Sequence, residues 1–106
     1  MTAGFTLCCL LWAHPGLEDD LVAYEDAVLA LMPPYGIEVL ERVRSDAGPE
    51  HPTEVQLYRV PNQAALDAYL ADPRRLALTP ERDRAVSRTD LFEVRRPGVE
   101  TDSPVE

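Results

Sequence analysis

The sequence predicts an α+β domain in which an antiparallel sheet carries two helices on one of its faces. Three observations support this fold class. A strongly apolar strand-like run opens the chain, an amphipathic helical stretch follows it, and two alternating segments precede a second helical region. The resulting order is β-α-β-β-α-β, which places both helices on the same side of the sheet. With 106 residues, the chain has room for one hydrophobic core and not for two.

The opening run, residues 5–13 (FTLCCLLWA), is β-prone and almost wholly apolar, as in a central strand that is covered on both faces. The segment His14-Pro15-Gly16 ends it. Because side chains alternate along a strand, the apolar residues divide into two sets that point to opposite faces of the sheet. One set is Phe5, Leu7, Cys9 and Leu11, and the other is Cys8, Leu10 and Trp12.

The next stretch predicts an amphipathic helix. Apolar residues recur at steps of three and four between residues 17 and 32, and three acids at Glu18–Asp20 suit the positive end of a helix dipole. Pro33-Pro34 ends the pattern.

The second half of the chain is predicted to form a β-hairpin, a further helical region and a last strand. The hairpin strands alternate apolar and polar residues on either side of a polar turn. Asn62 and Thr79 stand where helix N-caps are expected. The predicted ranges are 37–44 and 54–60 for the hairpin strands, 62–70 for the helix and 89–95 for the last strand.

One face of this sheet has no helix to cover it. Leu10 and Trp12 would leave a sizeable apolar patch there, and soluble monomers avoid such patches. Two copies of the chain can cover the patch by packing their sheets face to face around a two-fold axis. We therefore expect a homodimer formed through the open sheet face.

Charge and composition exclude several classes of partner. The formal net charge is −9, from 19 acids against 10 bases, and this surface disfavours nucleic acid and anionic membranes. The longest apolar run is too short to span a membrane, so we expect a cytoplasmic protein. Residues 1–96 are expected to form the domain, and residues 97–106 a disordered acidic tail.

Three stretches resemble one superfamily: LLWAHPG, LMPPYGIEVLERVR and VQLYRVPNQAALDAYLADPRRLAL. They are similar to the dimeric α/β-barrel superfamily of ferredoxin-like domains, chiefly its antibiotic-biosynthesis-monooxygenase-like branch and related uncharacterised actinobacterial domains. The resemblance covers roughly residues 5–96. It implies a ferredoxin-like dimeric α/β barrel with a cavity between sheet and helices. Its members include cofactor-free oxygenases, lactone isomerases and haem enzymes, so the resemblance does not select a reaction.

Two residues are candidates for proton transfer. His14 follows the first strand near the expected mouth of the cavity, and histidine is the residue type that most often serves as a general acid or base. Tyr58, on the second hairpin strand, can offer its hydroxyl to a buried ligand. The alternatives are an exposed loop histidine and a core tyrosine.

Four further residues are candidates for binding a substrate. Trp12 and Tyr24 could line a pocket for a flat ligand, or serve core and dimer packing. Glu41 and Arg59 interrupt apolar faces of neighbouring strands and could form an inward ion pair. A shift of one residue in strand phase would instead put both residues in solvent. The other alternative is a salt bridge between them at a dimer interface or at the sheet edge.

The charged runs 72–75 and 81–84 contain several arginines, one of which could hold a substrate carboxylate; such runs more often form a solvated face. The sequence has no phosphate-binding loop and no Cys/His cluster at metal spacing. We therefore predict neither a metal nor another cofactor.

Two functional hypotheses follow. The first is a cofactor-independent enzyme, of oxygenase, isomerase or cyclase type, that acts on a hydrophobic or aromatic small molecule in secondary metabolism. The second is a non-catalytic dimer that binds a small ligand or serves as an accessory protein. A third possibility is a structural dimer whose cavity is filled by side chains.

Overall fold

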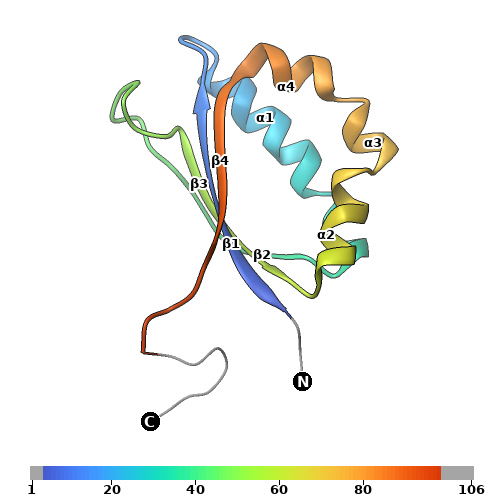
Figure 1. Cartoon of the computed structure of the whole chain (residues 1–106). Coiled ribbons are helices and arrows are strands. Elements are labelled where there is room, and N and C mark those ends of the chain that lie inside the picture. The colour runs from blue at the N-terminus through green and yellow to red at the C-terminus, as the bar shows by residue number, and fades with distance from the viewer. Residues whose placement is uncertain (1–3, 99–106) are drawn as a thin grey trace.

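Four antiparallel strands form one sheet, and the helices cover one of its faces, in the computed structural model, which describes residues 4–98 (Figure 1). The strand order is β2-β3-β1-β4. The predicted ferredoxin-like β-α-β-β-α-β order is confirmed, with β1 at the centre of the sheet. The predicted acidic tail lies outside the described residues beyond Gly98. The elements are β1 (Phe5–Ala13), α1 (Glu18–Leu29), the 3-10 turn η1 (Pro33–Tyr35), β2 (Glu38–Arg44), β3 (Glu54–Val60), α2 (Gln63–Leu70), α3 (Pro73–Leu76), α4 (Thr79–Ala85) and β4 (Val86–Val94).

The two faces of β1 differ as its alternation predicts. Leu7, Cys9 and Leu11 are at most 6% exposed and pack beneath the helices. Leu10 and Trp12 point away from the helices and are half-buried. We call this second side of the sheet the outer face; Figure 1 shows no helix on it.

The strand β2 departs from its predicted phase. Val39 lies opposite Tyr58 on β3, but Glu41 lies opposite Leu57, so Leu40 is an extra residue at a β-bulge. The bulge shifts the alternation by one position. The sequence pattern predicts that Glu41 and Val43 share the face of Val39. They lie instead on the opposite face, so that part of the prediction was wrong.

The bulge makes the outer face of the sheet more apolar. Val43 joins it and is 48% exposed, while Phe92 on β4 is 45% exposed. Arg88 stacks over Trp12 at 4.3 Å from the ring centroid. The apolar residues of the outer face are Cys8, Leu10, Trp12, Val43, Val55, Leu57, Phe92 and Val94.

The helix boundaries confirm one predicted cap and correct another. Asn62 Oδ1 accepts a hydrogen bond of 2.8 Å from the backbone N–H of Ala65. Leu78, not Thr79, is the N-cap of α4, and the Thr79 hydroxyl donates to the carbonyl oxygen of Leu76 instead. The strand β4 begins three residues earlier than predicted, because Val86 already pairs with β1.

The helix α1 contributes the main helical layer of the core. Leu21, Tyr24 and Val28 are almost fully buried against the sheet. Glu25 occupies the same stripe and is only 5% exposed. Within residues 4–98, no helix is long and apolar enough to cross a membrane.

Candidate functional site

A cleft of about 80 Å³ lies between the sheet and the helices. Its floor is apolar and comes largely from β1, while α1, α2 and the segment that follows α2 form the opposite wall. The polar residues on its walls include Tyr24, Glu25, Tyr58, Tyr69 and Arg75. An apolar hollow with a few convergent polar groups is the usual form of a small-molecule site.

Glu25 is the unusual residue of this cleft. It stands on the buried side of α1, four residues after Leu21 and three before Val28, where a helix normally places apolar side chains. Burial raises the pKa of the Glu25 carboxyl to about 6. A carboxyl group with this pKa exchanges protons readily near neutral pH, as a general base must.

Gln56 on β3 fixes the position of the Glu25 side chain. Gln56 is fully buried, and its Nε2 donates to Glu25 Oε1 at 3.0 Å and to Glu54 Oε1 at 2.7 Å. The Tyr58 hydroxyl donates to Gln56 Oε1. A single amide therefore holds Glu25, Glu54 and Tyr58 in one buried hydrogen-bond network.

The second buried carboxylate of this network, Glu54, has a cation as its partner. Arg42 Nε and Nη2 donate to the two oxygens of Glu54 at 2.9 and 2.8 Å. The same guanidinium binds the exposed Asp26 at 2.6 Å and the carbonyl oxygen of Val22. No described cation forms an ion pair with Glu25. The two buried carboxyl groups therefore differ, because Glu54 is neutralised by an arginine and Glu25 is not.

Tyr58 and Cys9 border the cleft as protonated groups. Burial raises the pKa of the Tyr58 hydroxyl far above its ordinary value. Burial also raises the pKa of the Cys9 thiol to about 11. Near neutral pH both groups therefore keep their protons, and Tyr58 acts as a hydrogen-bond donor rather than as a base.

The structure brings together only part of the site that the sequence suggests. Tyr24 and Tyr58 lie on the walls of the cleft. Trp12, Glu41 and Arg59 lie on the outer face, and the residue opposite Arg59 is Glu38 rather than Glu41. The outer position of Glu41 and Arg59 is the alternative that the strand phase left open.

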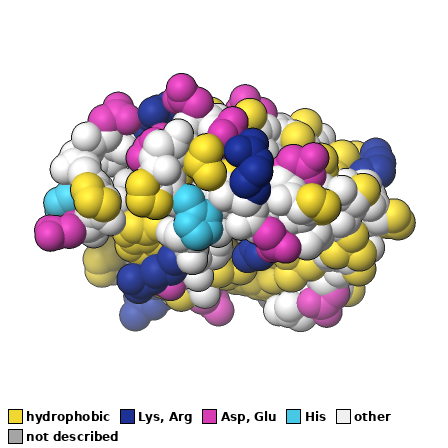
Figure 2. Space-filling view, turned by 90° about the horizontal axis from the view of Figure 1, so that it is seen from above, with side chains coloured by type: hydrophobic (Ala, Val, Ile, Leu, Met, Phe, Trp, Pro, Cys, Tyr) yellow, Lys and Arg dark blue, Asp and Glu magenta, His cyan; other side chains and the backbone are white. Residues whose placement is uncertain are grey.

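His14 lies in the turn after β1 and is exposed. Its backbone N–H donates to the carbonyl oxygen of Ala85, and its own carbonyl accepts from Leu17. The His14 side chain is not among the residues that line the cleft. Figure 2 shows exposed histidine side chains on the face that is seen from above.

Sequence reasoning missed Glu25, Gln56 and Glu54. One signal was present, because Glu25 interrupts the apolar stripe of the predicted helix. Nothing local indicates that the polar side of β3, rather than its Val55 and Leu57 side, is the buried one.

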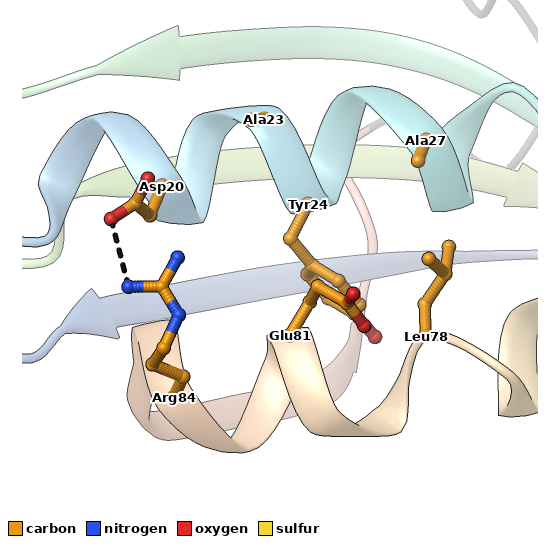
Figure 3. Close-up of a pocket in the computed structure, with 7 residues that line it drawn as sticks. All are labelled: Asp20, Ala23, Tyr24, Ala27, Leu78, Glu81 and Arg84. Carbon is orange, nitrogen blue, oxygen red and sulfur yellow. Dashed lines mark hydrogen bonds and ion pairs between the residues drawn. The ribbon is translucent and has the colours of Figure 1, made fainter.

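Two other hollows are less suited to a ligand. A groove between α1 and α4 is flanked by Asp20 and Arg84, which form an ion pair of 3.2 Å with each other (Figure 3). A wider hollow of about 350 Å³ lies between the turn after β1 and the hairpin loop. Its Arg44 already binds Asp46 and Asp19. Both hollows thus have charged groups that are exposed and already paired.

The raised pKa of Glu25 predicts a measurable dependence of stability on pH. The folded state binds the Glu25 proton more tightly than the unfolded state, so this contribution to stability is complete below about pH 4.3. It is lost as the pH rises through about 6. Wild type loses this contribution between pH 4 and pH 8, and Glu25→Gln does not have it. The unfolding free energy of Glu25→Gln minus that of wild type should therefore increase by about 2 kcal/mol over this range.

Urea denaturation at a series of pH values and at one fixed protein concentration measures this gain. The control is Glu50→Gln, which changes an exposed glutamate of the hairpin turn and should show no such trend. A constant difference between Glu25→Gln and wild type across the range would contradict the assignment.

Comparisons with known proteins bear on the fold. No family model matches the sequence, and no curated protein matches it significantly. A NIPSNAP-like domain protein from Burkholderia xenovorans superimposes with a TM-score of 0.74 at 12% identity, over 98% of this chain and 94% of that chain. A DABB family protein with a ferredoxin-like fold from Mesorhizobium loti gives 0.64 at 18% identity, over 90% of this chain and 98% of that one.

A third similar structure is SnoaB, described as a cofactor-independent oxygenase from Streptomyces nogalater. It superimposes with a TM-score of 0.66 at 15% identity, over 92% of this chain and 98% of SnoaB. The TM-scores of these three superpositions show a shared fold. The ferredoxin-like fold that the resemblance implies is therefore confirmed.

Proposed function

We propose that this protein is a homodimer whose cleft binds a small, largely apolar molecule and removes a proton from it without a cofactor. The observation that carries the proposal is Glu25, a buried carboxyl group with a pKa of about 6 on the wall of an apolar cleft. The likeness in fold to a cofactor-independent oxygenase is consistent with it.

The proposed chemistry begins at a carbon next to a carbonyl group. The Glu25 carboxylate takes a proton from this carbon, and the electron pair of the C–H bond moves into the carbonyl group to give an enolate. Exclusion of water from the apolar cleft strengthens each electrostatic contact to the enolate. The enolate then reacts further, or regains a proton from Glu25.

All the candidate residues except His14 have a role in this proposal. Gln56 positions Glu25, Tyr58 anchors Gln56, and Tyr24 forms part of the wall. Trp12, Glu41 and Arg59 belong to the face that pairs with the second copy. His14 is the competing proton acceptor from the sequence analysis, and it is tested beside Glu25.

Deuterium exchange tests the proton transfer without knowledge of the natural substrate. Enolisable ketones from acetone to 1-tetralone are incubated with the protein in D2O, and deuterium uptake is measured by mass spectrometry. We expect acceleration for at least one ketone. Loss of a general base typically costs about 10²–10⁴-fold in rate, and Glu25→Gln should fall in this range.

The control variants separate the two proton acceptors. His14→Ala should exchange as fast as wild type, and Glu25→Asp should keep part of the activity. Exchange that survives Glu25→Gln but not His14→Ala would transfer the role to His14. Absence of acceleration for every ketone would refute the proton-transfer proposal.

The same cleft allows a second candidate function, in which a ligand binds and does not react. Its volume of about 80 Å³ is small beside the ~300–1,000 Å³ of typical ligand pockets. A non-catalytic dimer could bind a small ligand there. Saturable binding of the same ketones, seen as chemical-shift changes at cleft residues without deuterium exchange, would support this second function.

A further inference from the structure

Arg75 combines a position on the cleft with an unmet hydrogen-bond donor. It lies on the short helix α3, and its guanidinium carbon is 5.3 Å from the centroid of the Tyr69 ring. Its Nη1 donates to the carbonyl oxygen of Leu70 at 3.3 Å. Its Nε is buried and has no hydrogen-bond partner in the described part of the chain.

The neighbouring arginine shows how different this environment is. Arg74 donates from Nε and Nη2 to the two carboxylate oxygens of Asp72 at 3.1 and 2.7 Å. Arg75 takes part in none of the ion pairs that form among residues 4–98. A buried donor without an acceptor is costly, so an acceptor brought by a ligand would be favoured at Arg75.

The charge of Arg75 acts on the polar groups of the cleft. Burial raises the pKa of Tyr24, Glu25 and Tyr69, and the positive charge of Arg75 opposes this rise in each of them. The guanidinium therefore lies within electrostatic reach of three side chains on the cleft wall. Arg82 borders the same cleft and adds a second positive charge.

The mouth of the cleft offers apolar surface to the rest of a ligand. Leu70 and Leu91 both border the cleft and are 36% and 45% exposed. A ligand with one negatively charged oxygen at Arg75 could therefore rest its apolar body between these two leucines. The whole chain has a net charge of −9 and repels anions, so an anion would be attracted to the local positive charge of this cleft and not to the surface in general.

We infer that Arg75 binds the anionic oxygen of an apolar organic ligand in this cleft, where the oxygen is that of a carboxylate or of an enolate. The inference rests on the proposed function in taking the cleft as the ligand site. It adds the chemical class of the ligand and the residue that recognises its charge. In the proposed proton transfer, Nε of Arg75 donates to the oxygen on which the negative charge develops.

Benzoate and benzamide are suitable probes because they share a ring and differ in charge. Their dissociation constants are measured by titration, following backbone amide signals of the protein by NMR. We expect wild type to bind benzoate more tightly than benzamide. Arg75→Gln should weaken benzoate binding by about tenfold or more, since it removes a charged hydrogen bond, and should weaken benzamide binding less, because benzamide carries no charge.

The matched control is Arg74→Gln. It removes the same charge from the neighbouring residue, and Arg74 does not line the cleft. It should leave benzoate binding unchanged, while Arg75→Lys should restore part of it. Equal losses in Arg74→Gln and Arg75→Gln, or undetectable benzoate binding at millimolar concentration, would overturn the inference. Benzoate binding that depends on Arg75 without any ketone exchange would refute only the proton-transfer proposal.

Discussion

Arg42→Ala is expected to lower the free energy of unfolding by about 3 kcal/mol, at the lower end of the range for breaking a buried ion pair. Arg42 supplies two hydrogen bonds and the only ion pair to the carboxylate of Glu54 within the described residues, and the side chain of Glu54 is 2% exposed. A third hydrogen bond to Glu54 comes from the uncharged Gln56. Without Arg42, a buried negative charge loses its partner close to Glu25. The lower end applies because the Arg42 side chain is 27% exposed and water reaches part of it.

Thermal and urea unfolding measure this loss, and Arg44→Ala is the matched control. Arg44 is two residues further along the same strand, but its partners Asp19 and Asp46 are exposed. Exposed pairs contribute at most about 1 kcal/mol, so Arg44→Ala should be nearly neutral. The double variant Arg42→Met with Glu54→Leu should recover most of the loss, since it removes both charges. Similar losses for Arg42→Ala and Arg44→Ala would show that the Glu54 pair is not a central stabilising contact.

Leu57→Lys is expected to convert a dimer into a monomer. Leu57 lies on the apolar outer face between Cys8 on β1 and Glu41 on β2. If two copies pair through this face, the substitution buries a lysine from each copy near the other, and the dissociation constant should rise by about 100-fold or more. The separated chain should still fold, because Glu41 stands opposite the new lysine.

Sedimentation or light scattering at micromolar concentration measures the mass, which should be twice that of the chain for wild type. Leu76→Lys is the control, because Leu76 is 51% exposed on α3, in the helical layer.

Trp12→Arg should also dissociate the pair, since it adds a guanidinium beside Arg88. As Trp12 is the only tryptophan of the chain, its fluorescence should shift to the red on dilution. A wild type that is monomeric at micromolar concentration would contradict the proposed dimer.

The candidate site was partly predictable from the sequence. Tyr24 and Tyr58 were expected near a ligand, and both line the cleft. Trp12 was a candidate for the same pocket, but the alternation of β1 directs it to the outer face. Choosing between these positions requires knowing which face of each strand the helices cover, and strand alternation alone does not contain that information.

The sequence by itself determined the order of the elements and the two-sided apolar character of β1, because helical periodicity, strand alternation and helix-ending prolines act within a few residues. Only the tertiary structure decided the phase of β2, through the bulge at Leu40, and the burial of the polar side of β3. That side can be buried because Glu25 from α1 and Arg42 from β2 meet Glu54 and Gln56 there. Hydrogen bonds between residues so far apart in the chain offset the cost of burying charge, and they exist only once the helix has been placed on the sheet.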